Sequence, residues 1–422
     1  MITKEKLFSG TYDSVLTYLY GAENVPVQQQ RYAELLNKFS ETFPDAEAPE
    51  LFSAPGRTEI GGNHTDHQHG CVVAASVDLD IASAAAKNGE GLIRVLSEGY
   101  PLTTVDLSDL KVREEEKNHT SALIRGVAAG MQERGFHIGG FDVYMTSNVL
   151  KGSGLSSSAA FEIMIGTLLN YLYNDGKVDP VTLAQIGQYA ENVYFGKPCG
   201  LLDQMACSVG GYVAVDFYDP AKPIVEKIDF DFTKSGYTMC IIDTKGSHAD
   251  LTDEYAAVPA EMKAVAACFG KEVLRQVPAH EFYEQMGRLR GKVSDRALLR
   301  ASHFYEENIR AQEIAQALKI GDFERFLKLS NQSGLSSYLY LQNVYSCKDP
   351  QNQSVSLALC VAQRLLRGRG SCRVHGGGFA GTIQAFVPNE QVQGFRQNIE
   401  RITGEGTCHL LSIRPVGGIK LS

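Results

Sequence analysis

The stretch GSGLSSSAA at residues 152–160, followed by FEIMIGTLLNYLY at 161–173, predicts a glycine- and serine-rich loop that leads into a helix. Glycines let the backbone approach a ligand closely, and the first turn of a helix offers unpaired N–H groups at its positive end. Serine hydroxyls add donors and can bind a hard cation. These features suit a triphosphate. Composition alone leaves open the plainer alternative of a helix capped by serine after a flexible turn.

The segment before this loop alternates apolar and polar residues. Phe141, Val143 and Met145 in GGFDVYMTSNVL (139–150) predict a strand, so the unit is strand, loop and helix. The loop is not a Walker motif, because G-x-x-x-x-G-K-[ST] does not occur in the chain. The chain also lacks the H-R-D and D-F-G motifs of protein kinases. A phosphate site at this loop therefore belongs to neither of these classes.

A second group of polar side chains lies in LFSAPGRTEIGGNHTDHQHG (51–70), a segment with too many glycines for a regular helix. Dense hydrogen-bonding side chains around two glycines indicate a clasp for the vicinal hydroxyls of a sugar or another polyol. The side chains concerned are Arg57, Glu59, Asn63, His64, Asp66, His67 and His69. A metal site is the competing interpretation, since three histidines and an aspartate lie within six residues. For His67 and His69 we favour a polar turn whose side chains only satisfy backbone groups.

Two further motifs are less specific when each is taken alone. CGLLDQ (199–204) places Asp203 at a loop-to-helix turn, twelve residues after Glu191. An acid at such a turn can be a base, a metal ligand or a helix cap. GGGFAG (376–381) lies between two predicted strands and is also typical of a glycine hairpin.

In this order, the four motifs resemble those of the galactokinase branch of the GHMP small-molecule kinases. Residues 53–66 (SAPGR to HTD) resemble the family's sugar-binding signature, and GSGLSSSAA resembles its phosphate loop. Glu191 with CGLLDQ resembles the metal and base segment, and GGGFAG the third motif. The resemblance runs from about residue 52 to near the C-terminus. It implies a two-domain α+β fold, with the active site in the cleft between a domain at 1–220 and one at 221–422.

The resemblance also implies a role for each matching residue. Asp203 matches the catalytic acid residue, either as general base for the sugar hydroxyl or as its electrostatic partner, and Arg57 matches the cation that faces it. Ser158 and Glu191 match the ligands of Mg²⁺. The residues that match the cradle for the ATP phosphates are Gly152, Ser153, Gly154, Leu155, Ser156, Ser157 and Ser158. The residues that match sugar contacts are Asn63, His64, Thr65, Asp66 and Tyr255.

The implied reaction is transfer of phosphate from Mg-ATP to the anomeric hydroxyl of galactose. One departure bears on the sugar, because Asn63 stands where the family has a glutamate that contacts the substrate around C6. A carboxylate at C6 would be repelled by glutamate but tolerated by Asn63 and His64. Galacturonate is therefore the alternative substrate, and N-acetylgalactosamine a further one. A sugar sensor without catalysis is a third hypothesis, against which the complete set of matching catalytic residues argues.

The overall composition excludes some partners. The 422 residues carry 49 Asp and Glu against 40 Lys and Arg, and no basic tract contains interleaved aromatic residues, so we expect no nucleic acid. Nine cysteines without a C-x-x-C pair indicate reduced thiols. No signal peptide and no run of about 18 apolar residues is present. We expect a cytoplasmic enzyme with sugar and ATP as ligands and no membrane partner. The sequence is compatible with a monomer.

Overall fold

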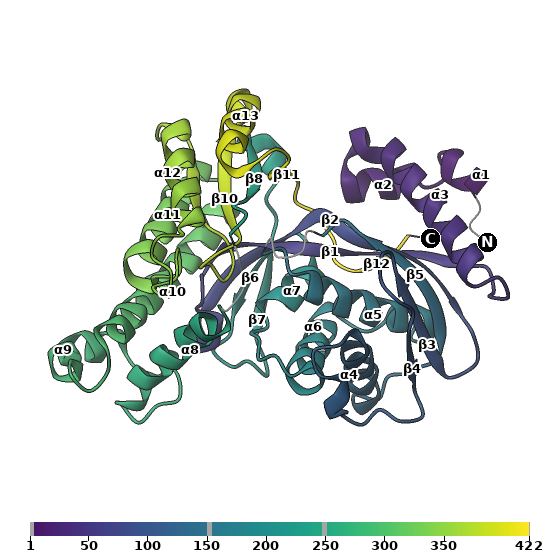
Figure 1. Cartoon of the computed structure of the whole chain (residues 1–422), viewed down its shortest axis with the longest axis horizontal. Coiled ribbons are helices and arrows are strands. Elements are labelled where there is room, and N and C mark those ends of the chain that lie inside the picture. The colour runs from purple at the N-terminus through teal and green to yellow at the C-terminus, as the bar shows by residue number, and fades with distance from the viewer. Residues whose placement is uncertain (1–3, 150–153, 247–250, 422) are drawn as a thin grey trace.

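The computed structural model describes residues 4–149, 154–246 and 251–421, and its α+β architecture contains two sheets (Figure 1). The large sheet has the order β12-β1-β2-β5-β3-β4, with β6 paired to β2 and β7 to β6. The small sheet has the order β11-β8-β10-β9. The strands of the large sheet are β1 (Glu50–Gly61), β2 (Cys71–Lys87), β3 (Leu92–Ser97), β4 (Thr103–Asp106), β5 (Phe141–Ser147), β6 (Tyr212–Asp216), β7 (Ile224–Ile228) and β12 (Ile419–Lys420). Those of the small sheet are β8 (Tyr237–Asp243), β9 (Ser371–Val374), β10 (Thr382–Pro388) and β11 (Cys408–Leu411).

The antiparallel pair β1 and β2 forms the centre of the large sheet, and nearly every residue of both strands is buried. One end of β2 pairs with β6 and the other with β5. The register between β1 and β2 shifts between Pro55 and Arg57 and again between Glu59 and Gly61. Such bulges re-aim side chains and are frequent beside active sites. Both bulges lie within residues 53–66, where the sequence places its sugar-binding signature.

Two layers of helices cover the large sheet on opposite faces (Figure 1). One face carries α4 (Thr120–Glu133), α5 (Ser157–Tyr173), α6 (Pro180–Tyr189) and α7 (Leu202–Val209). Most residues of α5 are apolar and buried, so this helix lies at the centre of the main hydrophobic core. The opposite face is covered by the N-terminal helices α1 (Lys4–Phe8), α2 (Asp13–Tyr20) and α3 (Val25–Thr42).

A buried carboxylate fastens the N-terminal helices to the sheet. Asp80 on β2 pairs with Arg31 of α3 at 2.6 Å and accepts a hydrogen bond from the Tyr20 hydroxyl of α2 at 2.6 Å. Arg414, close to the C-terminal strand, lies 3.3 Å from the same carboxylate. Both ends of the chain therefore meet at one side chain. This contact helps to hold α2 and α3 against the large sheet.

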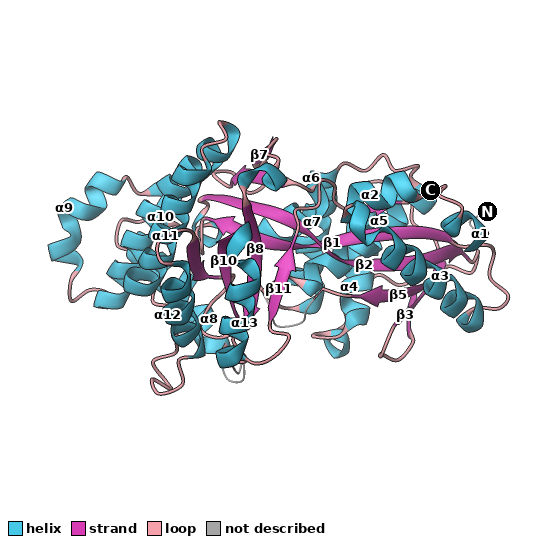
Figure 2. Cartoon of the chain, turned by 90° about the horizontal axis from the view of Figure 1, so that it is seen from above, coloured by secondary structure: helices cyan, strands magenta, loops and turns pink. Residues whose placement is uncertain are grey.

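The second half of the chain is mainly helical and gathers around the small sheet, at the far end of the molecule from the N-terminus (Figure 2). Its helices are α8 (Thr252–Ala267), α9 (Ala279–Leu289), α10 (Asp295–Lys319), α11 (Phe323–Ser336), α12 (Ser354–Leu366) and α13 (Val392–Thr403). Helix α10 also contacts β1 and β2, so it links this half to the large sheet.

Two strands from beyond residue 220 join the large sheet, since β7 pairs with β6 and β12 pairs with β1. The division of the chain at residue 220 stays a prediction. None of the described helices combines the length and the apolar character needed to cross a bilayer.

Candidate active site

Four elements bring the predicted catalytic residues together. Arg57 comes from β1 between its two bulges, and Asp203 from the first turn of α7. Ser156 precedes the first turn of α5. Glu191 lies on η4 (Ala190–Phe195), a π-helical turn that follows α6. Such turns are rare and are found mostly at functional sites.

The pair formed by Arg57 and Asp203 lies at the centre of this site. The Nε and Nη2 atoms of Arg57 both lie 2.7 Å from Oδ1 of Asp203. Burial alone would raise the pKa of Asp203, but the Arg57 guanidinium and the Ser156 hydroxyl outweigh it and hold that pKa below its usual value. Asp203 is therefore ionised at neutral pH. Its side chain keeps 35% of its surface exposed, against 7% for Arg57, so the carboxylate can meet a ligand.

The phosphate loop is joined directly to this pair. Arg57 donates through Nη1 to the carbonyl oxygen of Gly154 and through its backbone N–H to that of Leu155. Ser156 has a left-handed backbone with φ of 54°, and its hydroxyl donates to Asp203. Gly154 has φ of 71°, and a Cβ there would lie 3.0 Å from His375 Nδ1, so a side chain would be strained. Gly152 and Ser153 lie outside the described residues.

A second pair of predicted residues, Ser158 and Glu191, lies beside the phosphate loop. The Ser158 hydroxyl lies 3.4 Å from Oε1 of Glu191. Gln204 donates from Nε2 to Oε2 of Glu191 and to Oε2 of Glu162, at 2.9 Å each, and so fixes both carboxylates. Burial, together with the charge of Glu191, raises the pKa of Glu162 well above its usual value.

These residues fit a magnesium ion. No cluster of three histidine, cysteine or acidic side chains that could hold a metal ion occurs among the described residues. Magnesium usually takes one or two protein oxygens and completes its shell with water and phosphate oxygens. One carboxylate and one hydroxyl at the phosphate loop match this preference.

Two of the five predicted sugar contacts are used within the protein. Asn63 is fully buried, and its amide donates to both oxygens of Glu59, at 3.0 and 3.1 Å, and to the carbonyl of Gly376 at 2.8 Å. Its oxygen accepts from Asn343 at 2.9 Å. Thr65 is also fully buried, and its hydroxyl lies 2.6 Å from the carbonyl oxygen of Cys71.

The other three lie where separate segments meet. His64 contacts the Gly377 carbonyl oxygen at 3.1 Å, and the Tyr255 hydroxyl donates to that of Gly378 at 2.9 Å. Burial lowers the pKa of His64 to about 3, so the ring is neutral. Asp66 lies against Gly200, where a Cβ would come within 1.8 Å of Oδ2. The sugar signature, the CGLLDQ turn and the third motif therefore converge.

A cavity of about 570 Å³ beside the phosphate loop was not predicted from the sequence. Ser157 and Ser158 line its end next to the loop, and Val95, Leu123 and Phe161 are among its apolar lining residues. These residues come from β3, α4 and α5, so only the folded chain brings them together. In the sequence, these apolar residues look like ordinary core residues, and nothing near them indicates a cavity.

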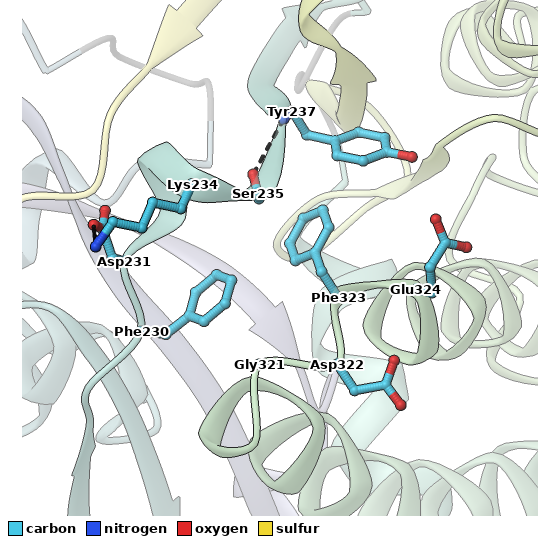
Figure 3. Close-up of a pocket in the computed structure, with 9 residues that line it drawn as sticks. All are labelled: Phe230, Asp231, Lys234, Ser235, Tyr237, Gly321, Asp322, Phe323 and Glu324. Atoms are coloured by element: carbon cyan, nitrogen blue, oxygen red, sulfur yellow. Dashed lines mark hydrogen bonds and ion pairs between the residues drawn. The ribbon is translucent and has the colours of Figure 1, made fainter.

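A different cavity, of about 510 Å³, lies between the segment that precedes β8 and the start of α11 (Figure 3). Phe230, Tyr237 and Phe323 line it. Two of its three carboxylates have structural partners, since Asp231 pairs with Lys234 and Asp322 caps α11 by accepting from the backbone of Arg325. None of the predicted site residues lines this cavity, and we assign it no catalytic role.

Comparisons with known proteins agree on one family. The model for the GHMP kinases N terminal domain matches residues 122–211, and that for the galactokinase galactose-binding signature matches residues 37–87. A galactokinase from Glaesserella parasuis is 32% identical over 378 residues, which cover 87% of this chain and 93% of the relative. One from Actinobacillus pleuropneumoniae is 32% identical over 382 residues, covering 88% and 95%.

Solved structures show the same relationship. The galactokinase of Lactococcus lactis, solved in complex with galactose, has a TM-score of 0.80 and 25% identity, and the match covers 92% of this chain and 99% of that one. The mevalonate kinase of Methanococcus jannaschii has a TM-score of 0.62 at 14% identity, covering 88% and 99%. The second likeness shows the fold alone.

Proposed function

Because the chain belongs to the galactokinase family of the GHMP kinases, and is thus a sugar kinase that uses ATP as phosphate donor, we propose that it phosphorylates the anomeric hydroxyl of galactose. The observation that carries the proposal is the contact of Arg57 and Ser156 with the single carboxylate of Asp203. It joins the sugar signature, the phosphate loop and the acid residue in one site.

Asp203 is the proposed base or electrostatic partner of the sugar hydroxyl. Its lowered pKa supports an ionised carboxylate at neutral pH, and its exposed surface supports contact with a substrate. Arg57 keeps this carboxylate charged and oriented, and lies close enough to the phosphate loop to share the charge of the transferred group. Phosphoryl transfer depends mainly on positioning and charge neutralisation, which this pair supplies.

Magnesium and the adenine ring have proposed places on either side of the loop. Ser158 and Glu191 would hold Mg²⁺, which when bound neutralises phosphate charge. The apolar cavity of about 570 Å³ would hold the adenine, because it adjoins Ser158 and has the size and lining of a small-molecule site. ATP would then extend from this cavity across the loop to Asp203.

For the sugar, we propose direct contact by His64, Asp66 and Tyr255. Asn63 and Thr65 would position the loop, because their polar atoms are engaged within the protein. The neutral His64 can donate to or accept from a hydroxyl, and the Tyr255 hydroxyl stays protonated because burial raises its pKa to about 12. These groups suit an uncharged polyol.

Galacturonate is the second candidate. Two observations favour it. Residue 63 is an asparagine and carries no charge. The nearby carboxylate of Glu59 is already paired with Arg373 at 2.9 Å. A substrate carboxylate at C6 would therefore meet no uncompensated negative charge from either residue. N-acetylgalactosamine differs at C2 and tests a separate part of the site.

The test is ADP release by the purified protein with Mg-ATP and four sugars, namely galactose, galacturonate, N-acetylgalactosamine and glucose. The position of the phosphate is then read by ³¹P NMR. We expect galactose to have the highest kcat/KM and the product to carry phosphate at C1. Turnover of galacturonate alone would keep the mechanism and replace the substrate. Binding of sugar without ADP release would instead support a sensor.

A further inference from the structure

Lys197 places a positive charge in the active site that none of the sequence motifs assigns. It follows η4, and Gly196 between them has a left-handed backbone with φ of 83°. This turn reverses the chain, so that the backbone N–H of Lys197 donates to the carbonyl oxygen of Glu191 at 3.1 Å. The side chain of Lys197 is thereby directed back toward the carboxylate of the same residue.

The Lys197 ammonium shares an oxygen with the phosphate loop. Its Nζ lies 3.3 Å from Oε1 of Glu191, the oxygen that also lies 3.4 Å from the Ser158 hydroxyl. The Lys197 side chain is 62% exposed, whereas that of Glu191 is 4% exposed. Glu191 is thus fixed in the protein, and Lys197 reaches it from the solvent side of the site. Because the Lys197 side chain is largely in water, its ammonium can turn from Glu191 to a phosphate that enters the site.

Arg57, the other cation of the site, already uses most of its donors within the protein. Arg57 uses Nε and Nη2 on Asp203 and Nη1 on the Gly154 carbonyl. Among the described residues, Glu191 is the one carboxylate within ion-pair distance of Lys197. In phosphoryl transfer, negative charge spreads over the three equatorial oxygens of the moving group, and protein cations stabilise it. Arg57 lies beside Asp203 and Lys197 beside Glu191, so a phosphate bound at the loop would have a cation available from each direction.

We propose that Lys197 is a second catalytic cation, which leaves Glu191 and binds the terminal phosphate when the nucleotide enters. The inference rests on the proposed kinase function. During transfer, the bond from the sugar oxygen to phosphorus forms as the bond from phosphorus to the ADP oxygen breaks, and the hydroxyl proton goes to Asp203. Lys197 exchanges no proton and forms no covalent bond. It also releases Oε1 of Glu191 for the metal that accompanies the nucleotide.

The experiment compares Lys197→Met, which keeps the apolar stem, with Lys197→Arg, which keeps the charge. Lys38→Met is the matched control, because Lys38 also forms an exposed ion pair, with Glu41 at 2.9 Å, and is 55% exposed. We expect Lys197→Met to lower kcat about 100-fold, with little change in the KM of the sugar, and Lys197→Arg to recover at least about tenfold of that loss. Lys38→Met should match the wild type.

A second readout does not depend on turnover. The affinities of AMP-PNP and ADP are measured by calorimetry in EDTA, so that no metal contributes. Lys197→Met should weaken AMP-PNP binding about 10-fold or more, and ADP binding much less, because a charge-assisted hydrogen bond to the terminal phosphate is lost. A Lys197→Met enzyme with kcat and AMP-PNP affinity within threefold of the wild type would overturn the proposal. A wild-type protein inactive on every sugar would contradict the kinase function instead, and AMP-PNP binding would still test Lys197.

Discussion

At the scale of single residues, Asp203 carries the most chemistry. Asp203→Asn keeps the shape of the side chain but removes its charge and its ability to accept a proton. We expect kcat to fall about 1,000-fold, because a positioned base contributes roughly 100- to 10,000-fold, while sugar binding stays measurable by calorimetry. Retained turnover in this variant would contradict the role proposed for Asp203.

The pH dependence of the reaction follows from the same carboxylate. The folded-state pKa of Asp203 is lowered below 3.8, so the ionised form is present above that value and is lost only as the pH falls through the folded-state pKa. The pKa of His64 is lowered to about 3, so this ring does not titrate near neutrality. We therefore expect kcat/KM to show no acid limb from either group between about pH 5 and 7. An inflection near 6.5 that disappears in His64→Gln would contradict this expectation.

At the scale of elements, a buried polar network joins the end of β1 to the hairpin of β9 and β10. Glu59 pairs with Arg373 at 2.9 Å and accepts from Asn63, which also contacts the Gly376 carbonyl. Arg373 also donates to the Glu59 backbone carbonyl at 2.8 Å. Apart from the Asn63–Glu59 hydrogen bond, these contacts cross from the sugar signature to β9 or to the third motif, so the network fixes how the two segments face one another.

The network predicts a strong coupling between two neighbouring side chains. Asn63→Asp should lower the Tm markedly, because it places a carboxylate against Glu59 and removes a donor from Gly376, at a cost of about 3 kcal/mol. Adding Glu59→Gln supplies a new donor to that carboxylate, so the double variant should recover more than about 1 kcal/mol relative to the sum of the single changes. Calorimetric unfolding of the wild type, the two single variants and the double variant gives the coupling free energy of this double-mutant cycle. Purely additive effects would show that the two side chains do not interact.

The local pattern of apolar and polar residues was sufficient to predict the helix and strand on either side of the phosphate loop. The sequence predicts a strand within residues 139–150, and β5 occupies Phe141–Ser147 there. It also predicts the helix after the phosphate loop, which is α5, because apolar periodicity and a loop signal coincide there. The pairing of Glu59 with Arg373 could not be predicted from the sequence. The two residues are 314 positions apart, and no local pattern links them. The cavity beside Ser158 was missed for the same reason.

At the scale of the whole molecule, the cluster around Asp80 is the point where the two ends of the chain are held. Arg31 on α3 and Arg414 near the C-terminus both contact this carboxylate, which is fully buried. Burial would raise the pKa of Asp80, but the two arginines outweigh it and lower that pKa. The stabilisation is therefore present above the ordinary value of 3.8 and is lost as the pH falls through the folded-state pKa.

Two aspartates on the same strand should respond in opposite ways to the same substitution. Asp80→Asn leaves two buried arginines without a carboxylate and should cost about 3–5 kcal/mol at pH 7. Asp78 forms no ion pair with any residue that the structure describes, and burial raises its pKa to about 6, so its ionised form opposes folding at pH 7. Asp78→Asn keeps an oxygen for the Ser412 N–H, which lies 3.0 Å from Asp78 Oδ1, and should leave the Tm unchanged or raise it. Neither variant should alter kcat at 25 °C, because neither side chain belongs to the proposed active site. If Asp80→Asn unfolds no earlier than Asp78→Asn, the N-terminal helices are held by their apolar contacts with the sheet rather than by this charge cluster.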